Sequence, residues 1–401
     1  MKYIIVQGDG MADRPLPDLG GRTPLDVAQT PNLDRMASRG ILGMTPTIPR
    51  GLSAAGEIGT MSILGYDPRC YQAGRSALEA ASLGVALGPE DVAYCCGLVS
   101  IDRSEGVERM QDVTAGRLGS AESAGLMADV QRALGNGEFE FHPGLGPRHL
   151  LVWRKGQEAA GGAAPHDIAG QAIAAHRPTG AGAETLRRLM ERAGMVLRDH
   201  TINHERRARG EPAATDVWLW GCGKSLEVPT LKARFGLDGA VVAAMDLVNG
   251  LGVLAGLDRV RVPGATGSLD TDYGAKVAHG LQVLDDHNFL FLHVQAPDEA
   301  GHMGNVAEKI KAIEAIDSLV IGRLFDGLAQ FGDWRLMVLP DHVTPCALKV
   351  HTDEPVPFVV FSSNDLAKAK GPSRRYTEAD ARDDGIFIPE AYTLIERLLR
   401  R

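Results

Sequence analysis

The sequence predicts an α/β protein with a mainly parallel sheet flanked by helices and a smaller α+β domain inserted into this core. Short apolar runs that precede helical stretches predict the parallel sheet. A more charged middle section interrupts this pattern, and the 401 residues exceed what one compact core usually needs. We therefore expect a discontinuous core at residues 1–80 and 215–401, with an inserted domain at residues 81–214.

The N-terminal part predicts one strand and two helices. Residues 3–7 (YIIVQ) form an apolar, β-rich run that ends in Gly8-Asp9-Gly10, which places an acid at the carboxyl end of a buried strand. Residues 30–40 (TPNLDRMASRG) have an N-cap candidate, a Pro at the next position and a final Gly, and these predict a helix. Residues 56–64 predict a second helix, which the small-residue stretch GLSAAGE opens.

The middle section predicts two charged strands and an amphipathic helix, at residues 137–142, 149–154 and 183–193. From residue 217 the α/β pattern resumes with a buried strand, VWLWG. The elements expected after it are a small-residue helix, a strand, a long helix and a strand, at residues 239–256, 289–294, 306–327 and 335–339.

Charge and composition argue against several functions. The formal net charge is −9 and the basic residues are scattered, whereas a nucleic-acid groove needs clustered Lys and Arg. No apolar run approaches the roughly 20 residues of a membrane-spanning helix, and the N-terminus lacks the longer apolar region of a signal peptide. Five cysteines without a CxxC pair are typical of reduced thiols. We expect a cytoplasmic protein without nucleic-acid or membrane partners.

Acids and imidazoles follow three predicted strands. The side chains are Asp9, Asp298, His302, Asp341, His342 and His351. Asp298 and His302 are four residues apart, so one helical turn would point both at one site. Any one of the six could be a helix cap or a satisfied polar residue, but unrelated caps would rarely all fall at strand ends.

Three Asp and three His together suit two divalent cations. Imidazole favours Mn, Zn or Co over Mg, whereas carboxylates accommodate all four metals. Two such ions can clamp both the attacking and the leaving oxygen of a phosphoryl transfer. The pattern therefore predicts a two-metal enzyme whose partner is a small phosphorylated metabolite.

Ten short motifs connect this chain with a known family. They are GDGMAD (8–13), TPNLD (30–34), SILGYDP (62–68), GRSALEAAS (74–82), RHLLV (148–152), HDI (166–168), WLWG (218–221), PGATGSLDTDY (263–273), APDEAGH (296–302) and PDHVTP (340–345). With them, the sequence resembles the archaeal-type cofactor-independent phosphoglycerate mutases of the alkaline-phosphatase superfamily, nearly from end to end. APDEAGH and the Asp-His pair are highly specific together. The resemblance implies an alkaline-phosphatase-like core.

The resemblance also implies roles, position by position. Asp298, His302 and His351 would hold one metal, and Asp9, Asp341 and His342 would hold the other. The residues implied to bind the phosphate or the substrate carboxylate are Arg75, Arg148, His166, Asp167 and Lys349. Arg suits this through forked hydrogen bonds and Lys through its point charge. The implied reaction interconverts 3- and 2-phosphoglycerate without 2,3-bisphosphoglycerate, through a serine that takes and returns the phosphoryl group.

Two positions depart from the family pattern. Family members have that serine just before an acidic residue ahead of SILGYD, and the same register here contains Gly56. Glycine has no side chain to phosphorylate. Ser53, three residues earlier, and Thr60, one helical turn later, are candidate substitutes; if neither reacts, hydroxide on the metals would make hydrolysis the default chemistry. The family's RCN triplet is replaced by residues 95–97 (CCG), so an Arg expected at the substrate is absent.

Three functions fit the sequence. The first is phosphoglycerate mutase. The second is another enzyme on the same scaffold, either a homoserine-kinase-like phosphotransferase or a metal-dependent phosphohydrolase. No GxxxxGK[ST] loop is present, so a nucleotide would have to bind through the metals and the inserted domain. The third is a catalytically inactive homologue that binds a phosphorylated ligand. The sequence also leaves a homo-oligomer open.

Overall fold

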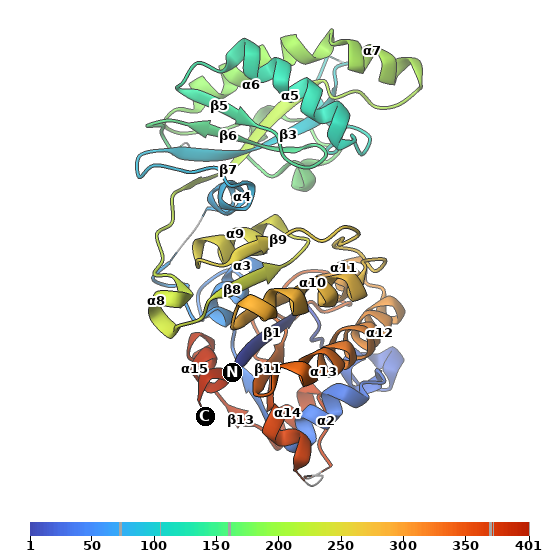
Figure 1. Ribbon diagram of the computed structural model, residues 1–401. Coiled ribbons are helices and arrows are strands. Elements are labelled where there is room, and N and C mark those ends of the chain that lie inside the picture. The colour runs from blue at the N-terminus through green and yellow to red at the C-terminus, as the bar shows by residue number, and fades with distance from the viewer. Residues whose placement is uncertain (72–73, 105, 159–161, 369–370, 372, 401) are drawn as a thin grey trace. The chain divides into compact units, whose positions relative to one another are not determined.

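The computed structural model describes residues 1–71, 74–104, 106–158, 162–368, 371 and 373–400. The chain divides into two compact units, which Figure 1 shows with their elements labelled. Unit 1 comprises Met1–Gln72 and Val228–Arg401, and unit 2 comprises Ala73–Glu227. The sequence predicts domain boundaries at 80/81 and 214/215, and these boundaries remain a prediction.

Unit 1 contains an eight-stranded sheet with the order β13-β2-β12-β11-β1-β10-β8-β9. The strands from β11 to β9 pair in parallel, whereas β12 runs antiparallel to both of its neighbours. The predicted mainly parallel sheet is therefore confirmed. The strands are β1 (Lys2–Gly8), β2 (Ile41–Thr45), β8 (Gly239–Val242), β9 (Asp258–Val260), β10 (Phe289–Val294), β11 (Trp334–Leu339), β12 (Val356–Ser362) and β13 (Ile386–Phe387).

The central strands of unit 1 are buried on both faces. Every residue of β10 is buried, as are the last five residues of β1. Such strands need continuous apolar runs, and for this reason the sequence predicted them correctly. The prediction of one helix over residues 239–256 is wrong, because its first four residues form β8 and the helix that follows is α9 (Asp246–Leu254). A Cβ at Gly239 would lie only 1.8 Å from the backbone oxygen of Phe289, so the close approach of β10 requires glycine there.

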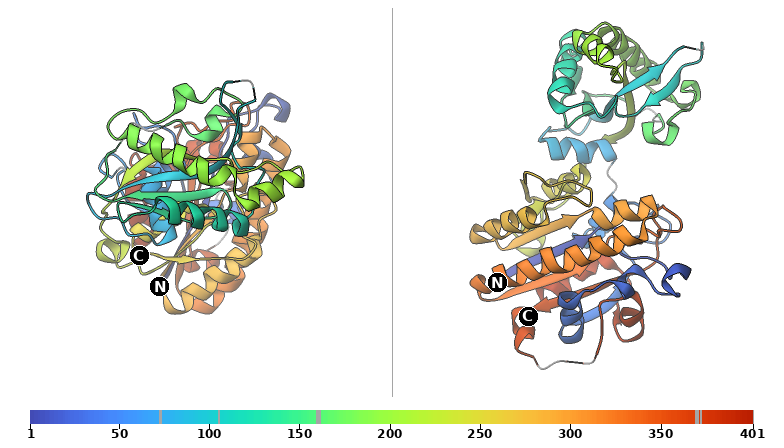
Figure 2. Two further views of the ribbon diagram at one scale, coloured as in Figure 1. Left: turned by 90° about the horizontal axis from the view of Figure 1, so that it is seen from above. Right: turned by 90° about the vertical axis from the view of Figure 1, so that its right-hand side faces the viewer.

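Helices cover both faces of the unit 1 sheet. α10 (Tyr273–Asp286) contacts β8 and β10, and α2 (Pro31–Arg39) contacts β2 and β12, within one apolar core. The right-hand view of Figure 2 shows the orange helices of this part of the chain alongside the strands. α9 packs on Val241, whose neighbour Val242 belongs to that core, so α9 lies on the opposite face.

The α-helices of unit 1 are α1 (Pro24–Val27), α2 (Pro31–Arg39), α3 (Gly56–Ile63), α8 (Leu231–Phe235), α9 (Asp246–Leu254), α10 (Tyr273–Asp286), α11 (Ala296–Met303), α12 (Val306–Ala315), α13 (Arg323–Leu328), α14 (Glu378–Asp383) and α15 (Leu394–Leu399). Short helices are η1 (Pro17–Leu19), η4 (Ile316–Gly322), η5 (Ala329–Phe331), η6 (Ser363–Ala367) and η7 (Ala391–Thr393). α2 and α3 confirm the two predicted N-terminal helices. The predicted long helix is α12 and α13, joined by the π-helical turn η4.

Unit 2 contains a five-stranded antiparallel sheet in which β3 pairs with β4, β6 and β7. Its strands are β3 (Val92–Asp102), β4 (Arg109–Asp112), β5 (Phe139–His142), β6 (Arg148–Trp153) and β7 (Asp216–Lys224). Its helices are α4 (Arg75–Leu83), α5 (Ser120–Leu134), α6 (Ala183–Arg198), α7 (Thr201–Ala208), η2 (Pro165–Ile168) and η3 (Ala174–His176). The left-hand view of Figure 2 looks onto the green helices of this unit.

The VWLWG run lies in β7 and therefore belongs to the antiparallel sheet of unit 2. The expectation that the parallel sheet resumes at residue 217 is wrong. The physical reason is that β7 is covered by α6 on one face and by α4 on the other. A strand covered on both faces has the same continuous apolar run in either kind of sheet, so the sequence pattern cannot distinguish them.

Candidate metal centre and anion pocket

Three neighbouring parallel strands bring the predicted ligands to one edge of the unit 1 sheet. β1 lies between β10 and β11, and the ends of the three strands are in register. Asp9 follows β1, Asp298 lies in α11 just after β10, and Asp341 follows β11. Because functional groups gather beyond the carboxyl ends of parallel strands, this edge is the natural place for a site.

The first ligand set consists of Asp9, Asp341 and His342. Nε2 of His342 lies 3.4 Å from Oδ1 of Asp9 and 3.3 Å from Oδ2 of Asp341. The three side chains are 3%, 0% and 1% exposed. These three ligand atoms are buried and have no hydrogen-bond partner among the described residues.

The second ligand set consists of Asp298, His302 and His351. Nε2 of His302 lies 3.3 Å from Oδ2 of Asp298, and Nε2 of His351 lies 3.4 Å from Oδ1 of the same carboxylate. The two imidazole Nε2 atoms are 2.8 Å apart. Nδ1 of His302 donates to the backbone oxygen of Lys349, and this contact holds the ring with Nε2 toward Asp298. His342 also lies within reach of this set, since its ligand atom groups with those of Asp298 and His351.

The donor chemistry of both sets fits divalent cations. Two buried carboxylate oxygens and a buried imidazole nitrogen without partners are costly to leave unsatisfied, and a cation satisfies all three at once. Mixed carboxylate and imidazole ligands are typical of Mn, Zn and Co sites. The residues present therefore fit a two-metal centre.

Burial and neighbouring charges shift the pKa values of two of the carboxylates. Burial, and then the nearby charges of Asp341 and Asp298, hold the pKa of Asp9 well above its usual range. Burial alone would also raise the pKa of Asp298, but hydrogen bonds with His302 and His351 outweigh it and hold this pKa well below its usual range. A cation between these groups would stabilise every carboxylate in its ionised form.

Three residues that the sequence did not single out support the ligands. Fully buried His293 places Nε2 2.9 Å from Oδ2 of Asp9, and burial lowers its pKa to about 3, so it is neutral. Thr344 donates from Oγ1 to Oδ1 of Asp298. Buried Lys309 donates to the backbone oxygens of Ala12 and Thr344. The sequence feature that could have revealed His293 is a single His within the otherwise apolar run FLFLHV.

Gly56 begins α3 directly beside the first ligand set. A Cβ at this position would lie 3.3 Å from Oδ2 of Asp341 and 3.6 Å from Nε2 of His342. Ser53 is exposed and makes no side-chain hydrogen bond within the described part of the chain. Thr60 is buried, and its hydroxyl exchanges hydrogen bonds with the Gln7 amide. A side chain at residue 56 would therefore be in direct contact with two ligand atoms of the first set.

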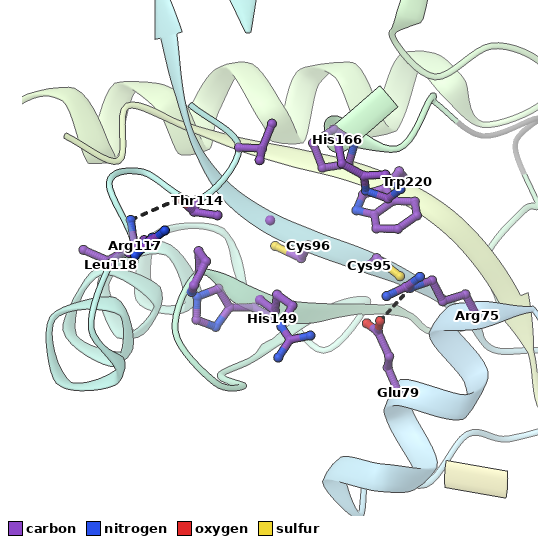
Figure 3. Close-up of a pocket in the computed structure, with 15 residues that line it drawn as sticks. Arg75, Glu79, Cys95, Cys96, Thr114, Arg117, Leu118, His149, His166 and Trp220 are labelled. Atoms are coloured by element: carbon purple, nitrogen blue, oxygen red, sulfur yellow. Dashed lines mark hydrogen bonds and ion pairs between the residues drawn. The ribbon is translucent and has the colours of Figure 1, made fainter. Parts of the chain in front are cut away.

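Unit 2 contains a pocket of about 530 Å³, drawn in Figure 3. Three of the predicted substrate-binding residues, Arg75, Arg148 and His166, line it together. The other lining residues are Glu79, Cys95, Cys96, Gly97, Val113, Thr114, Arg117, Leu118, Pro147, His149, Pro165 and Trp220.

The pocket has an excess of positive charge. Arg75 pairs with Glu79 at 2.9 Å and lies 5.0 Å from the centroid of the Trp220 ring. The guanidinium groups of Arg117 and Arg148 have no carboxylate partner within the described residues. Arg117, which the sequence did not single out, has a positive φ of 54°. Two unpaired guanidinium groups suit an anionic ligand.

The remaining predicted site residues lie elsewhere. Asp167 is exposed and does not line this pocket, and Lys349 lies in unit 1, where its backbone oxygen accepts from His302. Cys95, in place of the expected Arg, lines the pocket with a buried thiol, and burial raises its pKa. Gly97 pairs with Arg148, and a Cβ there would meet no atom closer than 3.8 Å.

A mainly parallel α/β core with two convergent sets of carboxylate and imidazole side chains fits the class of metal-dependent enzymes. The family model described as 2,3-bisphosphoglycerate-independent phosphoglycerate mutase matches residues 37–203. A Geobacter sulfurreducens protein named probable 2,3-bisphosphoglycerate-independent phosphoglycerate mutase is 46% identical over 401 residues, covering 100% of both chains. A Methanothermobacter thermautotrophicus protein named 2,3-bisphosphoglycerate-independent phosphoglycerate mutase 2 is 42% identical over 402 residues, covering 100% of this chain and 97% of the relative.

Solved structures agree. The cofactor-independent phosphoglycerate mutase from Thermoplasma acidophilum matches with a TM-score of 0.66 and 26% identity, over 100% of this chain and 99% of the other. A Pyrococcus horikoshii protein matches with a TM-score of 0.79 and 26% identity, over 99% and 96% of the two chains. The chain belongs to the 2,3-bisphosphoglycerate-independent phosphoglycerate mutase family, a family of isomerases, as its motifs predict.

Among the described residues, none of the helices has the length and the apolar character that crossing a bilayer requires.

Proposed function

We propose that this chain is a cytoplasmic, metal-dependent phosphoryl-transfer enzyme that interconverts 3- and 2-phosphoglycerate. The observation that carries the proposal is the convergence of all six predicted ligands at one sheet edge, where the three ligand atoms of the first set are buried and have no partner among the described residues. The names of relatives at 46% and 42% identity support the substrate. The place of this reaction in metabolism would be glycolysis.

The two ligand sets would each hold one divalent cation, and Mn²⁺ is the first ion to test. The ions would neutralise phosphoryl charge and lower the pKa of a bound hydroxyl group. His302 and His342 are already oriented for this role, because Nδ1 of each is engaged and Nε2 faces the other ligands. The protein thus supplies ligands that need little rearrangement.

Substrate recognition is proposed for the pocket of unit 2. Arg148 and Arg117 would bind an oxyanion of the substrate through their forked donors. Arg75, paired with Glu79 and stacked over Trp220, is fixed in place and would add a third guanidinium group. His166 is exposed at the same pocket, whereas Asp167 and Lys349 would act only as more distant charges.

The phosphoryl group cannot be held by residue 56, which has no side chain. For a mutase cycle, we propose Ser53 as the acceptor: its Oγ–P bond would form as the ester bond of the substrate breaks. The group would then return to the other hydroxyl of glycerate. Ser53 is exposed and not engaged within the described residues, whereas Thr60 is held in the core by Gln7. Ser53 is therefore the better candidate of the two.

The lack of a side chain at Gly56, beside the first ligand set, favours a second candidate function. A water or a substrate alcohol could occupy the place of the missing side chain, 3.3 Å from Asp341 at the Cβ position. Transfer to water would make the chain a phosphohydrolase, and transfer from ATP to an alcohol would make it a homoserine-kinase-like enzyme. A chain that binds phosphoglycerate without any turnover would be an inactive, ligand-binding homologue.

The test is a coupled assay with 3-phosphoglycerate and Mn²⁺ on the wild type, Ser53→Ala and Gly56→Ser. If Ser53 is the acceptor, wild type is active and Ser53→Ala is inactive. An inert wild type with an active Gly56→Ser would show that the nucleophile is lost, and released phosphate would show hydrolysis. Activity that survives removal of all divalent ions would refute the metal centre.

A further inference from the structure

Thr344 connects the two ligand sets through its single hydroxyl group. Its Oγ1 lies 3.0 Å from Nδ1 of His342 in the first set and 2.7 Å from Oδ1 of Asp298 in the second. All three side chains are buried. A carboxylate oxygen can only accept, and a hydroxyl group has one proton to donate. The hydrogen bonds therefore run in one direction, from His342 to Thr344 and from Thr344 to Asp298.

This direction fixes the proton of His342. Nδ1 has to carry it, so Nε2 presents a lone pair to Asp9 and Asp341 of the first set. The same hydroxyl group donates to Oδ1 of Asp298 and so holds this carboxylate with Oδ2 facing His302 and Oδ1 facing His351. One side chain thus fixes the orientation of one ligand in each set.

Thr344 is itself held in place by buried contacts. Its backbone N–H donates to the backbone oxygen of Ala12 at 3.3 Å. Its backbone oxygen accepts from Nζ of Lys309 at 2.7 Å, and Lys309 also pairs with Asp13 at 2.9 Å. These contacts attach the segment that follows β11 to the segment that follows β1, so the hydroxyl group has a fixed position.

Gly10 makes room for this connection. Its φ is 57°, and a Cβ there would lie 2.4 Å from Oγ1 of Thr344 and 2.6 Å from Oδ1 of Asp298. Any side chain at Gly10 would separate these two atoms or push both aside. The second glycine of the GDG motif is therefore explained by the contact between Thr344 and Asp298.

We propose that Thr344 is a positioning residue that orients one ligand of each set, so that the binding of both metal ions depends on its hydroxyl group. This inference rests on the metal centre proposed above. Groups that hold a metal ligand by a hydrogen bond typically change metal affinity by about 10- to 100-fold when they are removed. Because the hydroxyl group contacts a ligand in both sets, its removal should weaken the binding of both ions and not of one alone.

The experiment is calorimetric titration of Mn²⁺ into the metal-stripped full chain, for the wild type, Thr344→Ser and Thr344→Val. Ser keeps the hydroxyl group, whereas Val replaces it with a methyl group of nearly the same shape. Thr344→Val is expected to weaken both binding steps by about 10- to 100-fold, and Thr344→Ser is expected to stay close to the wild type. If Thr344→Val weakens neither step, or only one, the proposal is overturned.

Nitrogen NMR of the His342 ring in the metal-free protein gives a second readout that a role in packing would not change. The wild type and Thr344→Ser should show the proton on Nδ1, and Thr344→Val should lose this single tautomer. A wild type with the proton on Nε2 would overturn the proposal even if Thr344→Val does not fold. A wild type that binds no Mn²⁺ would refute the metal centre and this inference together. Two bound ions without mutase activity would count only against the proposed substrate.

Discussion

Unit 1 and unit 2 hold their charged groups in opposite ways. In unit 1, the ligand atoms of Asp9, Asp341 and His342 are buried and unpartnered among the described residues. In unit 2, the guanidinium groups of Arg117 and Arg148 lie on exposed residues that line a pocket. Burying an unpaired charge is costly, whereas an exposed charge is solvated.

This difference determines what each unit reveals about its ligand. The buried ligand atoms of unit 1 indicate both the charge and the position of the group that they would bind, because burial without a partner has a desolvation cost. The exposed Arg residues of unit 2 indicate only the sign.

The largest effect is expected in unit 1 from Asp341→Asn. Saturation of the wild type with Mn²⁺ at 1,000 times its dissociation constant should add about 4.1 kcal/mol of stability. The variant should lose most of this gain. Without metal it should be at least as stable as the wild type, because burial and the charge of Asp341 raise the pKa of Asp9. Thermal unfolding with and without Mn²⁺ measures both effects.

Asp383→Asn, at an exposed residue of α14, is the control for Asp341→Asn. An undiminished stabilisation of Asp341→Asn by Mn²⁺ would contradict the assignment of Asp341 as a metal ligand.

The next effect is a pH response of unit 1 through Glu378. Burial raises the pKa of this carboxyl group from 4.5 to about 7. Between these values the folded state keeps a proton that the unfolded state has released, so stability falls by about 3 kcal/mol as the pH rises through this window. Glu378→Gln should remove this decrease. Urea unfolding at pH 5 and pH 7 measures it, with exposed Glu396→Gln as the control; an unchanged slope would refute the role of Glu378.

Unit 2 should respond to pH with the opposite sign through His149. Burial lowers its pKa from 6.5 to about 4, so below pH 6.5 the unfolded state binds a proton that the folded state does not. Stability should fall by about 2 kcal/mol from pH 6.5 to pH 5. His149→Asn should remove this loss while keeping an acceptor for the N–H of Gly144.

Tryptophan fluorescence can follow unit 2 during this measurement, because Trp153, Trp218 and Trp220 lie there and Trp334 lies in unit 1. Exposed His204→Asn is the matched control. If His149→Asn keeps the acid sensitivity of the wild type, another group is responsible.

The smallest effect is expected from Arg148→Ala in the pocket of unit 2. Loss of one charge-assisted hydrogen bond at an exposed residue should weaken the binding of 3-phosphoglycerate by about 10-fold. The affinity for Mn²⁺ should not change, because the ligand sets lie in unit 1. Calorimetry measures both affinities, and Arg188→Ala, at a side chain that is 72% exposed in α6, is the control. Weaker Mn²⁺ binding in Arg148→Ala would contradict the separation of the two sites.

Much of unit 1 could be predicted from the sequence, because its signals are local. Strands buried on both faces produce the runs YIIVQ and FLFLHV, and ligands that follow strand ends are visible as motifs. β8 was missed because GAVV is short and merges with the apolar start of α9. β7 was assigned to the wrong sheet, since two-sided burial looks alike in parallel and antiparallel sheets.

The supporting residues of the centre could not be predicted, because their contacts are distant in sequence. Thr344 meets Asp298 across 46 residues, and Lys309 reaches Ala12 across 297. Threonine and lysine are common in loops and on helices, and a buried position gives no local mark. The same holds for Arg117, whose relation to Arg148 depends on the folded sheet of unit 2.

The lack of a side chain at Gly56 suggests an experiment in chemical complementation. A molecule of methanol has the two heavy atoms that a hydroxymethyl group would add at this position, where the nearest ligand atom is 3.3 Å from the Cβ site. With such a small alcohol as acceptor, the phosphoryl group would leave as a soluble methyl ester instead of staying attached to the protein. The methyl ester would then accumulate in solution, and its amount would measure how often the phosphoryl group leaves the substrate.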